Sequence, residues 1–314
     1  MSMKILVTTP TGKIGRRVVR ELLAPEFAVR VIAREPERLP KDILEQVEVI
    51  RGSTDDVSTL CKALDDSEAL FWCVPPAPLE CDDVRGHYER FAQSAVQAIN
   101  TTGTPRVVTI SGVGKGLASD AGPLSGLHAM EDILNESDGV VRHLRCGFFM
   151  ENFLLQVESI REHGIFSYPM PGYIPLPMVA ARDIADVALR WLVRGDWKGK
   201  GGIAVLGPEE LTFNQAAAIM ERILERPIRY HQAPANQFVG GLLGSGARLE
   251  HAHEQLCMFA ELARGIGGAE PRSADCSTCT TLAQWFWDYG AAEHRTTTLR
   301  AGPRASWSAP LRWN

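Results

Sequence analysis

Two glycines, Gly12 and Gly15, lie between a short apolar run and a helical pattern in the segment VTTPTGKIG. A loop of this kind turns sharply and presents the first amides of a helix to a pyrophosphate. Thr9 stands where a G-x-x-G-x-x-G loop has its first glycine, and Pro10 removes one amide. We predict a dinucleotide-binding loop with the candidate residues Thr9, Thr11, Gly12, Lys13, Ile14 and Gly15. A strand, turn and helix without a ligand is the alternative.

A second chemical signal follows the next apolar run, in the segment VIAREPER. An acid at this strand end would hold the ribose hydroxyls of NAD, but Arg34 stands here, with Arg38 one helical turn later. A guanidinium in this place suits the 2′-phosphate of NADP. Arg34 is therefore predicted to favour NADP(H), and a solvated arginine pair on a surface loop is the alternative.

Candidates for proton transfer are few. No tyrosine is followed four residues later by a lysine, so no phenol has the ammonium group that would lower its pKa for proton donation. Ser111 ends a later apolar run, and His128 begins the next helical pattern with Glu131 one turn on. An imidazole titrates near neutral pH, so we take Ser111 and His128 as candidate catalytic residues, with Glu131 orienting the ring. A capping hydroxyl and a surface histidine are the alternatives.

Aromatic side chains follow the sixth apolar run and recur in the segment YPMPGYIPLP. Aromatic and thioether groups suit a flat apolar molecule such as a quinone. The candidate substrate contacts are Phe148, Phe149, Tyr168 and Tyr173. Packing within the core is an equally weighted alternative.

Metal binding is not expected. His251, His253 and Cys257 precede the pair Cys276 and Cys279, but histidines two apart on a helix project in different directions. The seven cysteines are an odd number scattered over a long chain and are expected to be free thiols.

These residues lie on an alternation of short apolar runs and helical patterns. Strands are expected at residues 4–8, 28–33, 47–50, 69–74, 106–110 and 140–144, and helices at residues 13–23, 56–64, 82–100 and 125–136. This order predicts a doubly wound α/β fold with a parallel sheet. Its ligand site is expected at the carboxyl ends of the strands, where the winding reverses.

The alternation stops after about residue 147. A Pro-rich stretch at 168–177 is expected to be irregular, followed by a helix at 181–193, a strand at 202–206 and a mostly helical end with segments at 212–224, 227–231, 247–264 and 280–289. We expect residues 1–150, completed by about 181–207, to form a Rossmann-type NADP-binding domain. Residues 151–180 and 208–294 would form the substrate-binding region, and 295–314 a flexible tail.

Composition narrows the class of protein. The 314 residues carry 33 Lys and Arg against 38 Asp and Glu, a net charge of −5, so no basic surplus favours nucleic acid. No apolar stretch approaches the ~20 residues of a membrane helix, and the start lacks the pattern of a secretion signal. We expect a cytoplasmic protein whose partner is a small molecule and neither nucleic acid nor membrane. The oligomeric state stays open.

Several segments together resemble one family. The segments VTTPTGKIG, AREPER, VEVIRGSTDD, ALFWCVPP, VVTISGVG, LRCGFFMEN, ARDIADVA and TTLAQWFWD resemble the NmrA-like atypical short-chain dehydrogenases and reductases, which include triphenylmethane reductase-like and quinone reductase-like enzymes. The resemblance covers residues 3–288. It implies an NADP(H)-binding Rossmann domain with a small carboxyl-terminal substrate domain, and Val74 and Pro75 along the sugar and nicotinamide side of the cofactor. Three residues depart from the family pattern, namely Thr9 for a glycine, Ser53 for an acid near the adenine and Cys146 for a proline.

The expected function is that of an NADPH-dependent reductase of a small or medium apolar carbonyl, quinone or conjugated aromatic substrate. Ser111 and His128 would assist protonation. A non-catalytic NADP(H)-binding regulator or sensor is the alternative from another class, since the Tyr-x-x-x-Lys pair is absent. A cofactor-independent isomerase or cyclase is a third interpretation, because Thr9 and Pro10 alter the loop.

Overall fold

The six apolar runs of the first half form adjacent strands of one parallel sheet, and a seventh strand joins from later in the chain. The computed structural model describes residues 2–104, 106–117, 120–274 and 276–289. The strands are β1 (Met3–Val7), β2 (Phe27–Ala33), β3 (Glu48–Arg51), β4 (Ala69–Trp72), β5 (Arg106–Gly112), β6 (Val140–Cys146) and β10 (Lys200–Val205). Their order is β10-β6-β5-β4-β1-β2-β3, and every pairing is parallel. The winding reverses between β1 and β4, which confirms the doubly wound, Rossmann-type fold.

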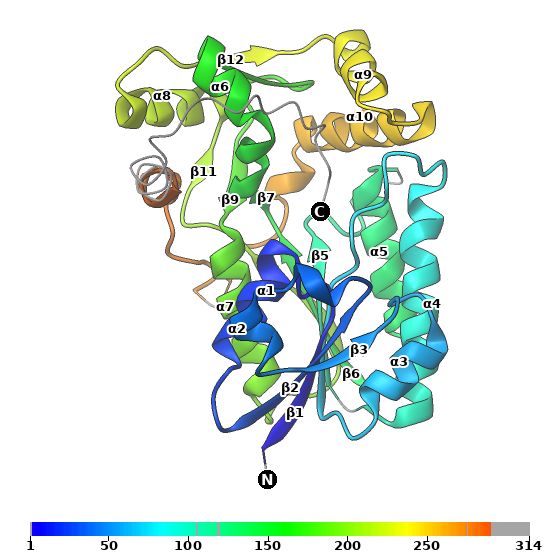
Figure 1. Cartoon of the computed structure of the whole chain (residues 1–314). Coiled ribbons are helices and arrows are strands. Elements are labelled where there is room, and N and C mark those ends of the chain that lie inside the picture. The colour runs from blue at the N-terminus through cyan, green and yellow to red at the C-terminus, as the bar shows by residue number, and fades with distance from the viewer. Residues whose placement is uncertain (1, 105, 118–119, 275, 290–314) are drawn as a thin grey trace.

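Helices cover both faces of this sheet (Figure 1). One face packs against α1 (Lys13–Glu21) and α7 (Ala181–Val193), and the other packs against α3 (Val57–Leu64), α4 (Val84–Thr102) and α5 (Pro123–Leu134). Strand β4 is buried along its whole length, as expected of a strand covered on both faces. Two short helices, η1 (Pro36–Arg38) and α2 (Lys41–Leu44), connect β2 to β3.

The upper part of the molecule in Figure 1 has its own small sheets and core. Strands β7 (Phe148–Phe149), β9 (Leu176–Val179) and β11 (Glu210–Leu211) form one sheet, and β8 (Ile165–Tyr168) pairs with β12 (Arg229–Gln232). The helices are η2 (Met150–Gln156), α6 (Val157–His163), α8 (Phe213–Leu224), α9 (Ala235–Gly244), α10 (Leu249–Ala263) and η3 (Ile266–Gly268), followed by helical residues 282–289. Phe153, Phe166 and Phe213 are fully buried at the centre of this second core.

The second half follows the sequence expectation in outline. Helix α7 has the bounds predicted for it, whereas the segment expected at 227–231 is strand β12 and helix α9 was not predicted. The carboxyl-terminal part is therefore a mixture of helices and short strands. The tail expected at 295–314 lies outside the described residues. Within the described ranges, no helix combines the length and the apolar character that crossing a membrane would need.

Candidate functional site

The loop between β1 and α1 turns sharply at Thr9. Thr9 has a φ of +48°, in the left-handed region that glycine adopts more readily. The amide of Gly12 donates to the carbonyl oxygen of Thr9 at 3.0 Å and closes the turn. A Cβ on Gly15 would lie 2.3 Å from the same oxygen, so α1 can pack against the loop only with glycine there. Thr9 thus adopts the conformation for which a glycine loop uses its first glycine.

The amino terminus of α1 leaves amides available for an anion. No side chain caps the first turn, and the first turn contains no acidic residue. The free amides and the dipole of the helix favour a negative charge at this end. Thr8 fixes the loop to the end of β4, because its Oγ1 accepts from the amide of Cys73 at 2.8 Å and lies 3.1 Å from the carbonyl oxygen of Phe71. The loop is therefore held where the winding of the sheet reverses.

Lys13, the first residue of α1, lies within electrostatic range of Glu151. Protein around the ammonium lowers the pKa of Lys13 by partial desolvation, and the charge of Glu151 acts in the opposite direction. Glu151 accepts from the amide of Ala181 at 3.0 Å and from Nε1 of Trp285 at 2.9 Å. Its carboxylate therefore connects the start of α7 to the last helix, close to the phosphate-loop candidate.

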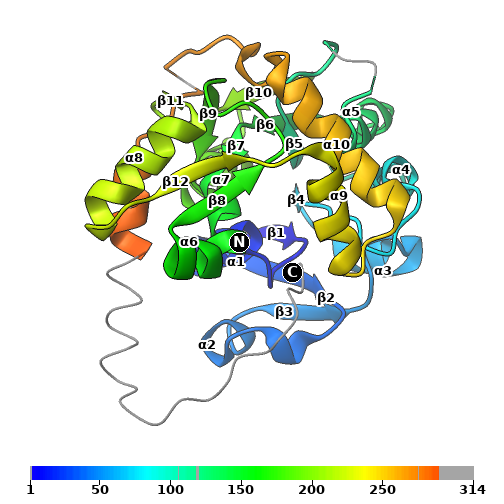
Figure 2. The same ribbon diagram turned by 90° about the horizontal axis from the view of Figure 1, so that it is seen from above.

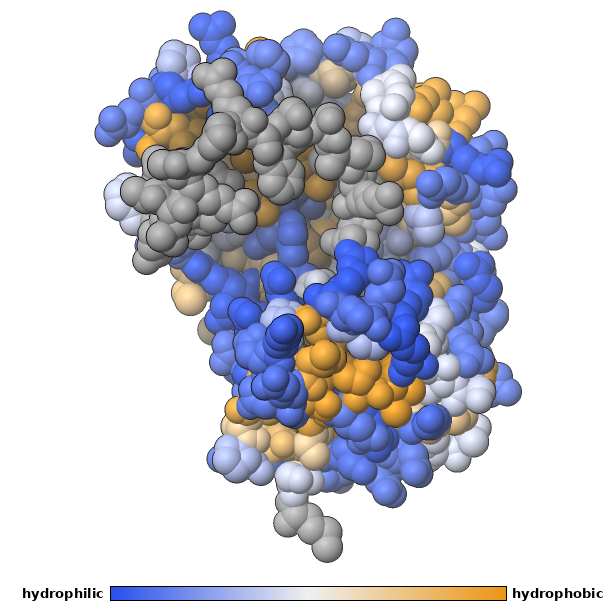
Figure 3. Space-filling model, viewed as in Figure 1, coloured by the Kyte–Doolittle hydropathy of each residue, from blue (hydrophilic) through white to orange (hydrophobic). Residues whose placement is uncertain are grey.

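Arg34 follows β2 and is exposed. Its neighbours Arg38 and Arg51 pair with Glu35 and Glu37, respectively, whereas no ion pair or hydrogen bond of the Arg34 side chain occurs among the described residues. Figure 3 shows hydrophilic residues around an apolar patch on the lower, sheet-containing part of the molecule. A guanidinium without a carboxylate partner, at the carboxyl end of β2, is available to bind an anion.

Three further cofactor candidates lie at the same edge of the sheet. Ser53 follows β3 and is partly buried, while Val74 and Pro75 follow β4. His87 on α4 holds the segment after β4, since its Nε2 donates to the carbonyl oxygen of Pro75 at 2.9 Å. Because carboxyl ends of parallel strands share one edge, these residues and the β1–α1 loop line the same side of the sheet.

Ser111 lies near the end of β5 with its side chain against α5. The residue is 2% exposed, and its Oγ is fully covered. The hydroxyl lies close enough to Glu131 to lower the pKa of that carboxyl group. A substrate could reach this hydroxyl only if neighbouring side chains moved.

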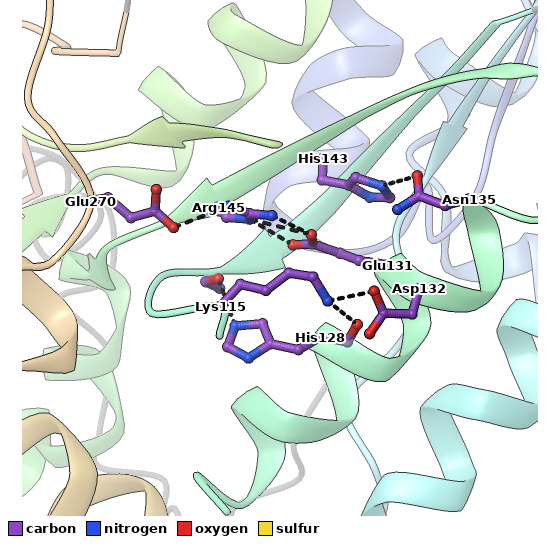
Figure 4. Close-up of polar contacts among 9 residues, drawn as sticks. Lys115, His128, Glu131, Asp132, Asn135, His143, Arg145 and Glu270 are labelled. Atoms are coloured by element: carbon purple, nitrogen blue, oxygen red, sulfur yellow. Dashed lines mark hydrogen bonds and ion pairs between the residues drawn. The ribbon is translucent and has the colours of Figure 1, made fainter. Parts of the chain in front are cut away.

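The side chain of His128, on α5, forms a hydrogen bond with the backbone (Figure 4). Its Nε2 lies 3.1 Å from the carbonyl oxygen of Gly112. A carbonyl can only accept, so this nitrogen is the donor. Burial lowers the pKa of His128, although the Gly112 contact opposes the shift. The ring is therefore a weak proton donor at neutral pH unless the contact with Gly112 breaks.

A buried acid–arginine pair lies behind these residues and was not predicted from the sequence. Glu131 is 0% exposed and receives hydrogen bonds from both Nε and Nη2 of Arg145, the shortest at 2.8 Å. Burial, the largest single effect, raises the pKa of Glu131. The hydrogen bonds and charge of Arg145, the charge of His143 and the hydroxyl of Ser111 together outweigh it and lower the pKa below its usual value. Nη1 of Arg145 also lies 3.4 Å from Glu270, in the segment after η3 (Figure 4). Glu131 therefore pairs with Arg145. The prediction that Glu131 orients the ring of His128 is wrong, because no hydrogen bond joins the two side chains.

His143 lies beside this pair, with 0% exposure, and donates from Nε2 to Asn135 at 3.0 Å. Burial lowers its pKa from 6.5 to about 4. The unfolded chain therefore binds a proton that the folded chain excludes between these values, so the free energy of unfolding falls as the pH drops through this window. The full loss is about 3 kcal/mol.

Urea unfolding of the wild type and of His143→Asn at several pH values between neutrality and the acid limit tests this. The variant should lose about 3 kcal/mol less than the wild type over the same window. Parallel pH profiles of the two proteins would contradict the assignment.

The aromatic candidates lie in different environments. Phe148 and Phe149 form β7 and are half-buried, the former against the second core and the latter against the sheet. Tyr168 is 7% exposed and stacks on Phe213 with ring centroids 4.8 Å apart, so its side chain is a core residue in this structure. Tyr173 is 70% exposed on the surface. The four side chains do not line one cavity.

No group of three His, Cys, Asp or Glu residues in the described ranges has an arrangement that could hold a metal ion. His251 is buried and His253 exposed, although they are two residues apart on α10. The cysteines are free thiols, all of them within the described ranges.

Comparison with known proteins gives a consistent set of relatives. The sequence profile described as the NmrA-like family matches residues 1–264. An NAD(P)H azoreductase of Xenophilus azovorans is 28% identical over 242 residues, which cover 77% of this chain and 81% of that protein. A (4-alkanoyl-5-oxo-2,5-dihydrofuran-3-yl)methyl phosphate reductase of Streptomyces griseus is 34% identical over 230 residues, covering 73% of this chain and 76% of the relative.

A solved structure has the same fold. The NADPH-dependent quinone oxidoreductase QOR2 of Escherichia coli, complexed with NADPH, superposes with a TM-score of 0.76 at 21% identity. The superposition covers 94% of this chain and 100% of the other.

Proposed function

The chain belongs to the NmrA-like family, and on this premise we propose that it is an NADPH-dependent reductase of a small or medium apolar carbonyl, quinone or conjugated aromatic substrate. The observation that carries the proposal is the exposed Arg34 without a partner among the described residues, at the same sheet edge as the uncapped start of α1. The relatives named as an azoreductase and a phosphate ester reductase support reduction of small conjugated molecules.

Two separate groups of residues would bind the pyrophosphate and the 2′-phosphate of the cofactor. The amides of Lys13 and Ile14 would bind the pyrophosphate, with Gly12 allowing close approach and with Thr9, Thr11 and Gly15 shaping the loop. Arg34 would pair with the 2′-phosphate and Ser53 would lie near the adenine. Val74 and Pro75 would flank the nicotinamide side. Bound NADPH would supply a hydride to the substrate.

The protein would contribute little to the protonation of the substrate. Ser111 and His128 are the proposed groups near the end of β5, but the first is covered and the second is bonded to Gly112. Either must be released from its present contacts to reach a substrate oxygen. A substrate that already carries positive charge would need no such donor, because hydride transfer neutralises it.

Residues 1–150 with 181–207 are proposed to bind the cofactor, and residues 151–180 with 208–294 to provide the substrate side. Phe148 and Phe149, which are half-buried between the two cores, are the better placed of the aromatic candidates. Tyr173 could contribute from its exposed position, whereas Tyr168 would need the core to open.

A panel of quinones, aromatic aldehydes and azo dyes, assayed by the loss of NADPH absorbance, tests the activity. At least one should be reduced with saturation kinetics and with NADPH preferred over NADH. Tight NADPH binding without turnover on any of them would instead favour the regulator or sensor. The covered Ser111 hydroxyl is the observation that keeps this second candidate open.

Replacing Gly12 with valine separates loss of cofactor from loss of fold. Gly12 has an extended backbone (φ −73°, ψ 167°), and its Cβ would lie 3.3 Å from the carbonyl oxygen of Thr9, so a small adjustment accommodates it. The added methyl groups would occupy the space proposed for the pyrophosphate. We expect no measurable NADPH binding and a melting temperature within a few degrees of the wild type, both measured on one preparation.

Gly15→Ala is the matched comparison. Its Cβ would lie 2.3 Å from a backbone oxygen, so this variant should lower the melting temperature strongly. Unchanged NADPH affinity in Gly12→Val would exclude the proposed loop role and favour a cofactor-independent enzyme.

A further inference from the structure

A small cavity lies between α10, the start of α5 and α4. These helices lie near one another in the right-hand part of Figure 2. The cavity has a volume of about 40 Å³, and its walls come from four segments, including Pro76 after β4, Val84 and Tyr88 of α4, Pro123 of α5, and His251 and Gln255 of α10. Pro76 directly follows Pro75, one of the residues proposed to flank the nicotinamide. A volume of this size holds about two or three water-sized groups, enough for one end of a ligand and too little for a whole substrate.

His251 and Gln255 are the polar residues of the cavity lining. His251 is 4% exposed, and neither ring nitrogen has a hydrogen bond among the described residues. Nδ1 is fully covered, so Nε2 is the nitrogen that keeps accessible surface. Burial lowers the pKa of His251, although the charge of Glu80 acts in the opposite direction, and the ring stays neutral at neutral pH. A buried imidazole without a partner at the wall of a cavity is a group whose hydrogen-bonding capacity is left for a ligand.

The charges around the cavity are negative. Glu254 precedes the lining residue Gln255, and Asp83 precedes Val84. Burial, and then the charges of Asp120 and Asp83, raise the pKa of Glu254, so both aspartates lie within electrostatic range of Glu254. None of the three carboxyl groups has a cation within ion-pair distance among the described residues. The charge of Arg85 reaches Asp120, but its guanidinium binds Glu89 at 2.7 Å. This field repels an anion and attracts a cation.

We propose that this cavity is a subsite for a protonated amine at one end of a conjugated substrate, with Nε2 of His251 accepting a hydrogen bond from the ammonium group. The carboxylate of Glu80, with those of Asp83, Asp120 and Glu254, supplies the attraction. The proposal rests on the proposed function, because it assigns the substrate class to the same reductase. A neutral imidazole accepts from an ammonium, whereas the surrounding carboxylates disfavour carboxylate or phosphate ends of similar size.

Benzylammonium is a suitable probe because its charged group fits the cavity and its ring can remain outside. Calorimetric titration of the full chain, with and without NADP⁺, should show saturable binding of benzylammonium and none of benzoate at equal concentration. His251→Ala should weaken benzylammonium binding about tenfold or more, the loss of one hydrogen bond to a charged group. Glu254→Gln should weaken it several-fold, and the exposed positions His253→Gln and Glu250→Gln on the same helix serve as controls.

A nitrogen-15 NMR titration of the wild type provides a second measurement if His251→Ala does not fold. Benzylammonium should shift the Nε2 resonance of His251, and benzoate should not. The subsite is overturned if benzylammonium does not bind saturably, if benzoate binds equally well, or if the His251 resonance stays unchanged at saturation. NADPH affinity of the same preparation is measured separately, so loss of the proposed reductase function and loss of the subsite give different results.

Discussion

Replacing Arg34 with alanine is expected to weaken NADPH binding about 10- to 150-fold, while leaving NADH binding within about twofold of the wild type. A hydrogen-bonded ion pair with a phosphate contributes about 1.5–3 kcal/mol, and NADH lacks the 2′-phosphate that would form it. The guanidinium is exposed and has no carboxylate partner among the described residues, so no existing ion pair must break on binding. Titration of both nucleotides against both proteins measures the effect.

Arg51→Ala is the matched control. Arg51 ends the neighbouring strand β3 and is exposed like Arg34, but it already pairs with Glu37. NADPH affinity should change less than about threefold in this variant, since its charge is already neutralised. Equal losses in Arg34→Ala and Arg51→Ala would indicate a general effect of positive charge and would contradict a specific 2′-phosphate site.

Replacing Arg145 with methionine is expected to lower the free energy of unfolding by about 3–5 kcal/mol. Glu131 is 0% exposed, and Arg145 is its partner through two hydrogen bonds to Oε2, at 2.8 and 3.2 Å. Without the guanidinium, a buried carboxylate would remain uncompensated, which is more costly than losing the pair as a whole. Urea unfolding of the wild type and the variant measures the difference.

The double variant Arg145→Met with Glu131→Leu is the control for this interpretation. Removing both charges should recover most of the lost stability, because two apolar side chains can pack where the ion pair lay. Glu270→Ala should cost less than about 1 kcal/mol, since its contact with Arg145 is 3.4 Å and lies nearer the surface. A double variant as unstable as Arg145→Met would show that packing, and not the unpaired charge, sets the loss.

The sheet could be predicted from the sequence because its strands are short apolar runs separated by helical patterns. Each of the first six strands was expected within a few residues of its observed bounds, and α7 was expected with the bounds it has. Helix α9 was missed because Gly240, Gly241 and Gly244 lower the helix propensity of its segment.

The candidate site was predictable only where local sequence determines it. Thr9 and Gly15 belong to a loop whose geometry follows from neighbouring residues, and Arg34 follows from its strand end. The pairing of Glu131 with Arg145 depends on the packing of α5 against β6, and Ser111 is covered for the same reason. The charged residues in the segment VVRHLRC were a signal, since a strand buried on both faces requires partners for its arginines and histidine.

The most direct test of the account is a crystal structure of the full chain grown with NADPH. We predict the pyrophosphate at the amides of Lys13 and Ile14, the 2′-phosphate within hydrogen-bond distance of Arg34, and the nicotinamide beside Val74 and Pro75. A dinucleotide bound elsewhere, or a 2′-phosphate directed away from Arg34 into solvent, would contradict the central claim.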